Sequence, residues 1–179
     1  MDENIIQNLI KDVAELKQRL FDTNFDVNFS KTLEVFNSKY SRDRKFRIYL
    51  SSNQAITQNV NTKVALDTVT FDIQGNFVSA SNRYLAKEDG YYLVIGSVTY
   101  QQAPDANALI QSMIYKNNAA VSIYSTNSSI GSGLFTIPIM DIIQLNAGDY
   151  IELFTYHNSV GSKNVVAGTN YSYLIVNKL

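Results

Sequence analysis

Few residues in this sequence could support acid–base or metal chemistry. His157 is the only histidine, and there is no cysteine. Disulfides and thiolate metal sites are therefore excluded, and a hydrolytic triad would depend on a single candidate. His157 lies at the end of an expected strand, over 150–156, where we interpret it as a surface or interface residue rather than a catalytic one.

Paired carboxylates are the next candidates for chemistry. Asp67 with Asp72, and Asp141 with Asp149, could in principle support glycoside cleavage, which needs two carboxyl groups. All four lie in turn contexts that Asp also occupies for structural reasons. An enzyme is therefore the less favoured interpretation.

Cation and phosphate sites have equally weak sequence support. Asp89, Asp105 and Asp149 could help to bind Ca²⁺, but no loop has the dense carboxylate spacing of a calcium site. The glycine-bearing stretch 128–133 is expected between two strands, whereas a phosphate cradle precedes a helix. The sequence thus predicts no metal, no cofactor and no catalytic residue.

Charge is concentrated in the first quarter of the chain. Residues 1–45 carry 16 of the 31 charged side chains, and the net charge is -1. This balance does not favour nucleic acid as a partner. There is no apolar run of membrane-spanning length, and the acidic start Met1–Asn4 is unlike the basic start of a signal peptide. A charged segment followed by a charge-poor, β-rich body predicts a boundary near residues 44–46.

The charged segment begins with a heptad pattern. Apolar residues recur at spacings of 3 and 4, which is the a/d pattern of a coiled coil. The five positions are Ile6, Leu9, Val13, Leu16 and Leu20. Asp12 at g and Lys17 at the following e would attract each other between parallel chains, and Ile5 and Ile10 widen the apolar seam. A wide seam favours a coiled coil of three or more helices. The alternative to a coiled coil is one amphipathic helix docked on its own domain.

The segment between this helix and the body is harder to interpret. Residues 25–29 alternate like a short strand, and residues 30–40 have helical spacing. The basic cluster 41–45 is typical of a solvated linker. We therefore divide the chain into a coiled-coil or anchor helix at 1–22, a neck or linker at 23–45, and a β-rich head at 46–179.

The head is organised around the stretch 91–100. One face of this expected strand carries Tyr92, Val94, Gly96, Val98 and Tyr100, and the other carries Tyr91, Leu93, Ile95, Ser97 and Thr99. Its first half, 91–95, is apolar on both faces, whereas an antiparallel strand with one solvated face alternates. Both faces must therefore be covered, and in a single sandwich the second cover requires another subunit.

Ten short strands separated by turn residues predict a sandwich or jelly roll. The expected strands are 46–51, 63–66, 68–72, 82–85, 91–101, 108–115, 121–124, 134–145, 150–156 and 171–176. The turns include Asp89–Gly90 and Lys116–Asn118, whose residue types tolerate turn backbones.

Six stretches of the head form an ordered set of motifs: Asn61–Leu66, Phe71–Phe77, Tyr84–Tyr92, Ile114–Asn118, Leu145–Leu153 and Tyr171–Ile175. This set resembles the globular C1q-like domain of the C1q/tumour-necrosis-factor superfamily. Three positions depart from the family pattern: Lys87 replaces a corner proline, and Asn118 and Tyr173 replace glycines. No collagen-like repeat precedes the domain.

The resemblance implies an all-β jelly-roll head in a tight homotrimer, with one sheet facing the three-fold axis and a coiled-coil stalk in front. Tyr91, Tyr92, Leu93, Val94, Ile95, Tyr171 and Tyr173 are the expected trimer contacts in the head. A cysteine-free chain that begins in its stalk resembles bacteriophage fibres.

We expect a non-enzymatic structural protein of the virion, a head fibre or capsid decoration protein, whose residues 1–45 bind other capsid proteins. Its head would bind a host or surface ligand, glycan or protein, without inserting into a membrane. The alternatives are a tail-fibre protein for host attachment, or a non-viral binding module that is extracellular or on a bacterial surface.

Overall fold

The computed structural model describes residues 3–20, 31, 44–102, 104–128 and 133–179. The chain divides into two compact units, Met1–Asp43 and Arg44–Leu179, and each is described by itself. The strand and helix predicted at 25–29 and 30–40 fall outside the described residues, apart from Lys31. None of the described helices is long and apolar enough to cross a membrane.

The first unit contains one amphipathic helix, α1 (Glu3–Leu20). Glu3 lies in the first turn, where a negative charge is favourable beside the helix N-terminus. The apolar stripe of α1 is open to solvent: its described members are between 41% and 64% exposed and comprise Ile5, Ile6, Leu9, Ile10 and Val13. A single helix of this length is marginal in water and needs to bury such a stripe. The helix is as predicted, whereas the coiled coil that would bury its apolar stripe stays a prediction.

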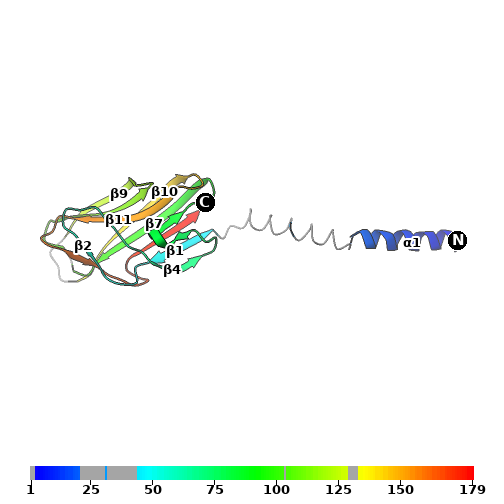
Figure 1. Ribbon diagram of the computed structural model, residues 1–179, viewed down its shortest axis with the longest axis horizontal. Helices are drawn as coiled ribbons and strands as arrows, with labels where there is room; N and C mark the ends of the chain where they lie inside the picture. The colour runs from blue at the N-terminus through cyan, green and yellow to red at the C-terminus, as the bar shows by residue number, and fades with distance from the viewer. Residues whose placement is uncertain (1–2, 21–30, 32–43, 103, 129–132) are drawn as a thin grey trace. The chain divides into compact units, whose positions relative to one another are not determined.

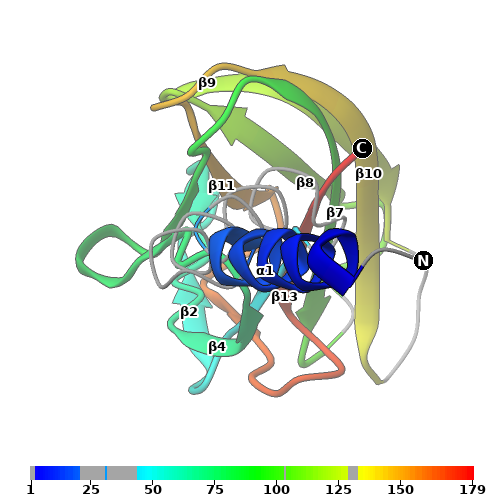
Figure 2. The same ribbon diagram turned by 90° about the vertical axis from the view of Figure 1, so that its right-hand side faces the viewer.

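The second unit, called the head below, is a sandwich of two antiparallel sheets (Figure 1). In sheet A the strand order is β2–β12–β7–β13–β1–β4, and β10 pairs with the other edge of β7. Its strands are β1 (Lys45–Tyr49), β2 (Gln54–Ile56), β4 (Thr68–Asp72), β7 (Gly90–Tyr100), β10 (Phe135–Leu145), β12 (Lys163–Val165) and β13 (Tyr173–Lys178). Figure 2 shows β10 at one margin of the head, beside β7.

In sheet B the order is β5–β6–β11–β8–β9, and β3 also pairs with β11. Its strands are β3 (Thr62–Lys63), β5 (Phe77–Val78), β6 (Arg83–Leu85), β8 (Leu109–Lys116), β9 (Ala119–Asn127) and β11 (Tyr150–His157). The single short 3₁₀ helix described spans Ser79–Ser81. The predicted all-β sandwich with an N-terminal helix is therefore confirmed.

Prediction and structure differ most at the shortest strands, and β9 also extends beyond the expected 121–124. β2, β5 and β12 were not expected, and the strand expected at 63–66 forms pairs only at Thr62–Lys63. Segments this short cannot display an alternating pattern. β3 and β12 each pair with a long strand, β11 and the end of β7, whereas β2 and β5 pair only with the short strands β12 and β6.

The core lies between β7 and β11. Tyr92, Val94 and Val98 of β7 are at most 2% exposed, as are Ile151 and Leu153 of β11. At Gly96 the two sheets come unusually close, because a Cβ added there would lie 2.6 Å from Leu153 Cδ1 and 3.0 Å from Ile139 Cγ2. β7 is thus the strand on which both the core and sheet A are assembled.

The turn between β8 and β9 explains one departure from the family pattern. Asn117 and Asn118 have φ angles of 50° and 69°. Two successive left-handed residues make the type I′ turn that suits a two-residue hairpin. Asn tolerates this backbone, so Asn118 can stand where the family has glycine.

Candidate functional site

The two faces of β7 differ in what they contact. Tyr92 and Val94 point into the sandwich core and are 2% and 0% exposed. Tyr91, Leu93 and Ile95 point away from the core, and Tyr91 is 58% exposed. The expected trimer contacts are corrected accordingly: Tyr92 and Val94 are removed, because the opposite sheet of the same chain covers their face.

The outward residues of β7 continue into cross-strand rows over sheet A. Ile95 lies opposite Met140 of β10 and opposite Ile175 of β13, and Ile175 lies opposite Arg47. Arg47 in turn lies opposite Phe71 of β4. Neighbouring side chains in such rows are close enough to form one continuous surface. We call this outer surface of sheet A face A.

Face A is rich in exposed apolar side chains. A second row places Ile142 of β10 opposite Leu93. Met140 is 67% exposed and Ile142 is 57% exposed, while Phe71 of β4 is 38% exposed. Contiguous exposed apolar residues of this kind mark interaction surfaces. Face A is the strongest candidate for a functional surface in the head.

The end of face A nearest Tyr100 is already covered. Ser97 and Thr99 are 4% and 1% exposed. Their hydroxyls donate hydrogen bonds to the carbonyl oxygen of Tyr171 at 3.0 and 2.9 Å. This explains why the outward residues of β7 change from apolar to polar after Ile95: the segment before β13 covers them within the same chain.

The two expected tyrosines near β13 both lie at face A. Tyr173 is an outward residue of β13, and the Arg47 guanidinium lies over its ring, 4.7 Å from the centroid. Tyr171 is 38% exposed. The structure therefore brings Tyr91, Leu93 and Ile95 onto the same sheet surface as these tyrosines.

Face A borders a groove between the edge strands β9 and β10, and Ile95 and Met140 belong to both. The groove has a volume of about 510 Å³ and is lined by Ile95, Ser122, Ile123, Tyr124, Pro138, Ile139, Met140 and Asp141. Pro138 is tolerated because β10 is an edge strand that pairs only with β7. The Ser122 hydroxyl donates a hydrogen bond to Asp141 Oδ2 across the groove. The groove leaves no pattern in the sequence, because β9 and β10 belong to different sheets and do not pair through their backbones.

The expected helix contacts occupy the exposed stripe of α1 as far as they are described. Ile6, Leu9 and Val13 are 41%, 64% and 48% exposed, and Asp12 is also exposed. The side chains of Leu16, Lys17 and Leu20 lie outside the described part of the chain. A pocket of about 320 Å³ along α1 is lined by Leu9, Ile10, Val13 and Ala14.

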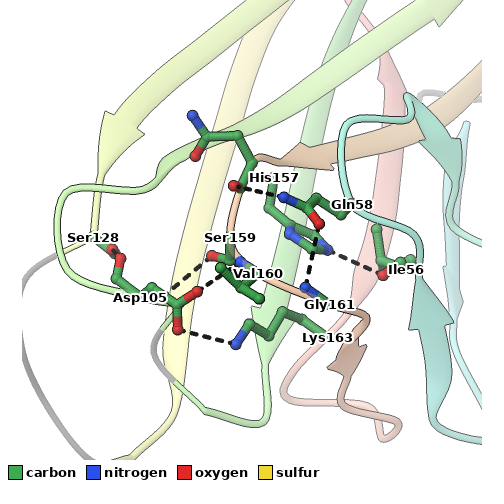
Figure 3. A network of polar contacts seen from close by, with 10 residues as sticks. Ile56, Gln58, Asp105, Ser128, His157, Ser159, Val160, Gly161 and Lys163 are labelled. Carbon is green, nitrogen blue, oxygen red and sulfur yellow. Dashed lines mark hydrogen bonds and ion pairs between the residues drawn. The ribbon is translucent and has the colours of Figure 1, made fainter.

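His157 is buried, contrary to the expected surface or interface position. It is 0% exposed, because it shares the inward face of β11 with Ile151, Leu153 and Thr155. Its Nε2 lies 3.0 Å from the Ile56 carbonyl oxygen, so we place the ring proton on this nitrogen (Figure 3). The ring also packs edge-on against Tyr100, whose hydroxyl pKa is raised to about 12 by burial.

The loop beside His157 is held by Asp105 (Figure 3). Its carboxylate accepts hydrogen bonds from the Val160 backbone at 2.6 Å and from Lys163 Nζ at 3.2 Å. The Val160 N–H and the Lys163 ammonium hold the pKa of Asp105 below its usual value. Asp105 therefore has a structural role at this end of the head.

The other carboxylates considered for chemistry also bind their own backbone. Asp72 accepts hydrogen bonds from the N–H groups of Asn76 and Phe77, both at 2.8 Å. Asp67 accepts from the Ser51 N–H at 2.9 Å. Among the described residues, no three His, Asp or Glu side chains gather closely enough to hold a metal ion.

No family model and no curated protein matches this sequence. Solved structures do match. The chain is similar to Eiger TNF from S. frugiperda, with a TM-score of 0.57, 12% identity, and coverage of 75% of this chain and 91% of that chain. It is also similar to murine APRIL, with a TM-score of 0.51, 12% identity, and coverage of 75% of this chain and 99% of that chain. At this identity the likeness concerns the fold, and it confirms the predicted TNF-like jelly roll.

Proposed function

We propose that this chain is a homotrimeric structural and binding protein that uses face A as its subunit interface. The observation that carries the proposal is the exposed apolar surface of Tyr91, Met140 and Ile142 over sheet A. Burying one large apolar side chain contributes about 1.5–3 kcal/mol. A second copy of the chain presents the same chemistry and can cover this surface.

Two features favour three subunits. The C1q/tumour-necrosis-factor resemblance implies a trimer, and the jelly-roll fold of the head supports that resemblance. The stripe of α1 extends beyond a strict a/d seam through Ile5 and Ile10, which are 58% and 57% exposed. Wide seams are typical of bundles with more than two helices.

The proposed setting is the bacteriophage virion, as a head fibre or decoration protein. Residues 1–45 attach the trimer to capsid proteins, and the head binds a host or surface ligand. This role needs no catalysis, and the carboxylates of the head are engaged in structural hydrogen bonds. A tail-fibre protein and a non-viral binding module on a bacterial surface are the alternatives.

Light scattering on the full chain tests the trimer. One chain has a mass of 20.1 kDa, so we expect three times that mass. Met140→Lys combined with Ile142→Lys should give a folded monomer, because each charge would be buried without a partner. The control is Val160→Lys at a loop residue that is 78% exposed. A monomeric wild type, or a double variant that stays trimeric, would contradict the interface.

Mass spectrometry of purified phage particles from the source of this gene tests the setting. We expect the chain to copurify with head proteins after tails are removed. Recovery with isolated tails would favour the tail-fibre alternative. Absence from particles, together with labelling on intact bacterial cells, would favour the non-viral module.

A further inference from the structure

Three aromatic side chains stand on the outer surface of sheet B, called face B below. β11 turns Phe154 and Tyr156 outward, because the alternating residues Leu153 and Thr155 are buried in the core. Tyr115 of β8 stacks on Phe154, with ring centroids 3.9 Å apart and planes at 20°. All three rings are half-buried. They form an aromatic surface that is already ordered and loses little side-chain entropy when it binds.

Amide side chains from the loop between β2 and β3 border these rings. Asn61 Nδ2 donates a hydrogen bond to the Tyr115 hydroxyl at 3.1 Å. The Tyr156 hydroxyl donates one to Asn59 Oδ1, also at 3.1 Å. Both amides are exposed, and these bonds orient them. Within the described part of the chain, Asn59 Nδ2 and Asn61 Oδ1 have no other bond, so face B presents an available donor and an available acceptor.

The Glu152 carboxylate beside the rings is paired within the chain. Glu152 lies opposite Tyr115 and is only 5% exposed, and its Oε1 lies 2.7 Å from Lys63 Nζ. The Arg83 guanidinium lies 4.1 Å from the centroid of the Tyr150 ring. Arg83 keeps its positive charge there, whereas the three rings and the two amides are uncharged. A ligand that lies across the rings therefore meets aromatic and amide groups, and charged probes show whether Arg83 attracts an anion instead.

The part of face B that carries the three rings offers less exposed apolar surface than face A. On face A, Met140 and Tyr91 are 67% and 58% exposed. Around the three rings of face B the aromatic surface is half-buried and Met113 is 1% exposed, and exposed Ile123 (56%) lies opposite Met113 on the edge strand β9. A protein partner gains its affinity mainly by burying large apolar side chains. Face B is better suited to a small, hydrogen-bonding ligand.

We propose that face B binds a neutral oligosaccharide across Tyr115, Phe154 and Tyr156. The C–H groups of a sugar ring would contact the aromatic rings, which attract weakly positive hydrogens. Sugar hydroxyls would accept from Asn59 Nδ2 and donate to Asn61 Oδ1. This inference rests on the binding role proposed above and names its surface and ligand class.

A glycan array probed with the labelled full chain tests the inference. The neutral probes are maltohexaose, cellohexaose, chitohexaose and mannohexaose, and the charged probes are hexasaccharides of hyaluronan and heparin. We expect binding to at least one neutral probe and not to the charged probes. Calorimetry with the neutral probe that binds best should show at least a tenfold loss of affinity for Asn61→Ala and for Tyr156→Ala.

The matched control is Gln102→Ala, which removes an exposed amide away from face B and should bind like the wild type. Melting curves identify variants that fail to fold. Because Asn61 is exposed, Asn61→Ala should leave the core intact. Binding to no neutral probe, binding only to charged probes, or equal affinity of the folded Asn61→Ala variant would overturn the inference.

Light scattering on the same samples separates this inference from the proposed trimer. A monomeric wild type that still binds a neutral probe through Asn61 would contradict the trimer and support face B. A trimer that binds no neutral probe would support the trimer and overturn the glycan inference. If Tyr156→Ala instead lowers the trimer mass, face B is covered by another copy, and the glycan inference is overturned.

Discussion

At the scale of single residues, Gly96 allows the two sheets to approach each other closely. A methyl group there would meet Leu153 Cδ1 at 2.6 Å, and Leu153 is 1% exposed and has little room to move. We expect Gly96→Ala to lower the free energy of unfolding by about 1–3 kcal/mol, the usual cost of overpacking a core. Chemical denaturation of the full chain measures this loss.

A double-mutant cycle shows whether Leu153 is the cause. Leu153→Val removes the methyl that Gly96→Ala would meet, so the double variant should lose less stability than the sum of the two single losses. Strictly additive losses would mean that the added methyl is accommodated elsewhere.

Asp149 links stability to pH. Its carboxylate lies 2.9 Å from Lys116 Nζ and accepts from Asn117 Nδ2 at 2.7 Å and from the Asn146 N–H at 2.8 Å. The Lys116 ammonium is the main cause that holds the pKa of Asp149 at about 2, below its usual 3.8. The folded pKa is the lower one, so this stabilisation is complete above pH 3.8 and is lost as the pH falls towards 2.

Asp149→Asn should therefore destabilise the head near neutral pH, by about 1 kcal/mol once solvent screening is considered. The difference in melting temperature between wild type and variant should shrink between pH 5 and pH 2. A difference that stays constant over this range would show that the charge of Asp149 is not responsible.

At the scale of elements, β7 and α1 each have an apolar surface that the described part of their own unit leaves uncovered. β7 has one face in the core and another that continues into face A, and α1 has an apolar stripe open to solvent. Neither element is fully covered by the described parts of its own unit. Assembly with other copies of the chain would cover both.

A double substitution distinguishes the two interpretations of α1. Changing Val13 and Leu16 to Asn would put polar groups in a coiled-coil seam, and each unpaired buried amide costs about 1–3 kcal/mol. If α1 forms a coiled coil, the helical circular-dichroism signal should fall while the β signal and the trimer mass persist.

The alternative predicts a different melting curve. If α1 is docked on its own head, helix and sheet signals should be lost together in one transition at a lower temperature. Changing exposed Lys11 and Glu15 to Gln in the same helix is the control and should leave both signals unchanged.

At the scale of the whole molecule, the division into two units predicts a division of labour. A chain that begins at residue 44 retains both sheets and the entire core described above. We expect this truncated chain to fold and to form the trimer through face A. Circular dichroism and light scattering measure both outcomes, and a folded monomer would assign trimer formation to residues 1–43.

The same truncation tests the proposed anchor. The truncation removes residues 1–43 of the proposed anchor 1–45. If these residues attach the protein to the particle, the truncated trimer should not be incorporated when it is supplied to a phage that lacks the full chain. Quantifying it in purified particles provides the measurement. Normal incorporation would refute the anchor role and leave the head to make the attachment.

The sequence by itself determined the features that depend on local chemistry. Alternation with period two predicted the long strands, and Asn117 and Asn118 marked a turn because Asn tolerates a left-handed backbone. Heptad spacing predicted α1. The ordered turn and strand motifs were sufficient to predict a TNF-like jelly roll at a level of identity where the structural neighbours share only 12% of their residues.

Only the tertiary structure decided which way each strand faces. Period two shows that Tyr91 and Leu93 share a side of β7, but the opposite sheet decides that this side is outside and that His157 is inside. Pairing across long separations was equally hidden. Asn59 meets Tyr156 across 97 positions of sequence, because β11 and the loop after β2 are brought together by the sandwich. A contact of this kind leaves no local pattern, so face A, face B and the groove between β9 and β10 appear only once the sheets are packed.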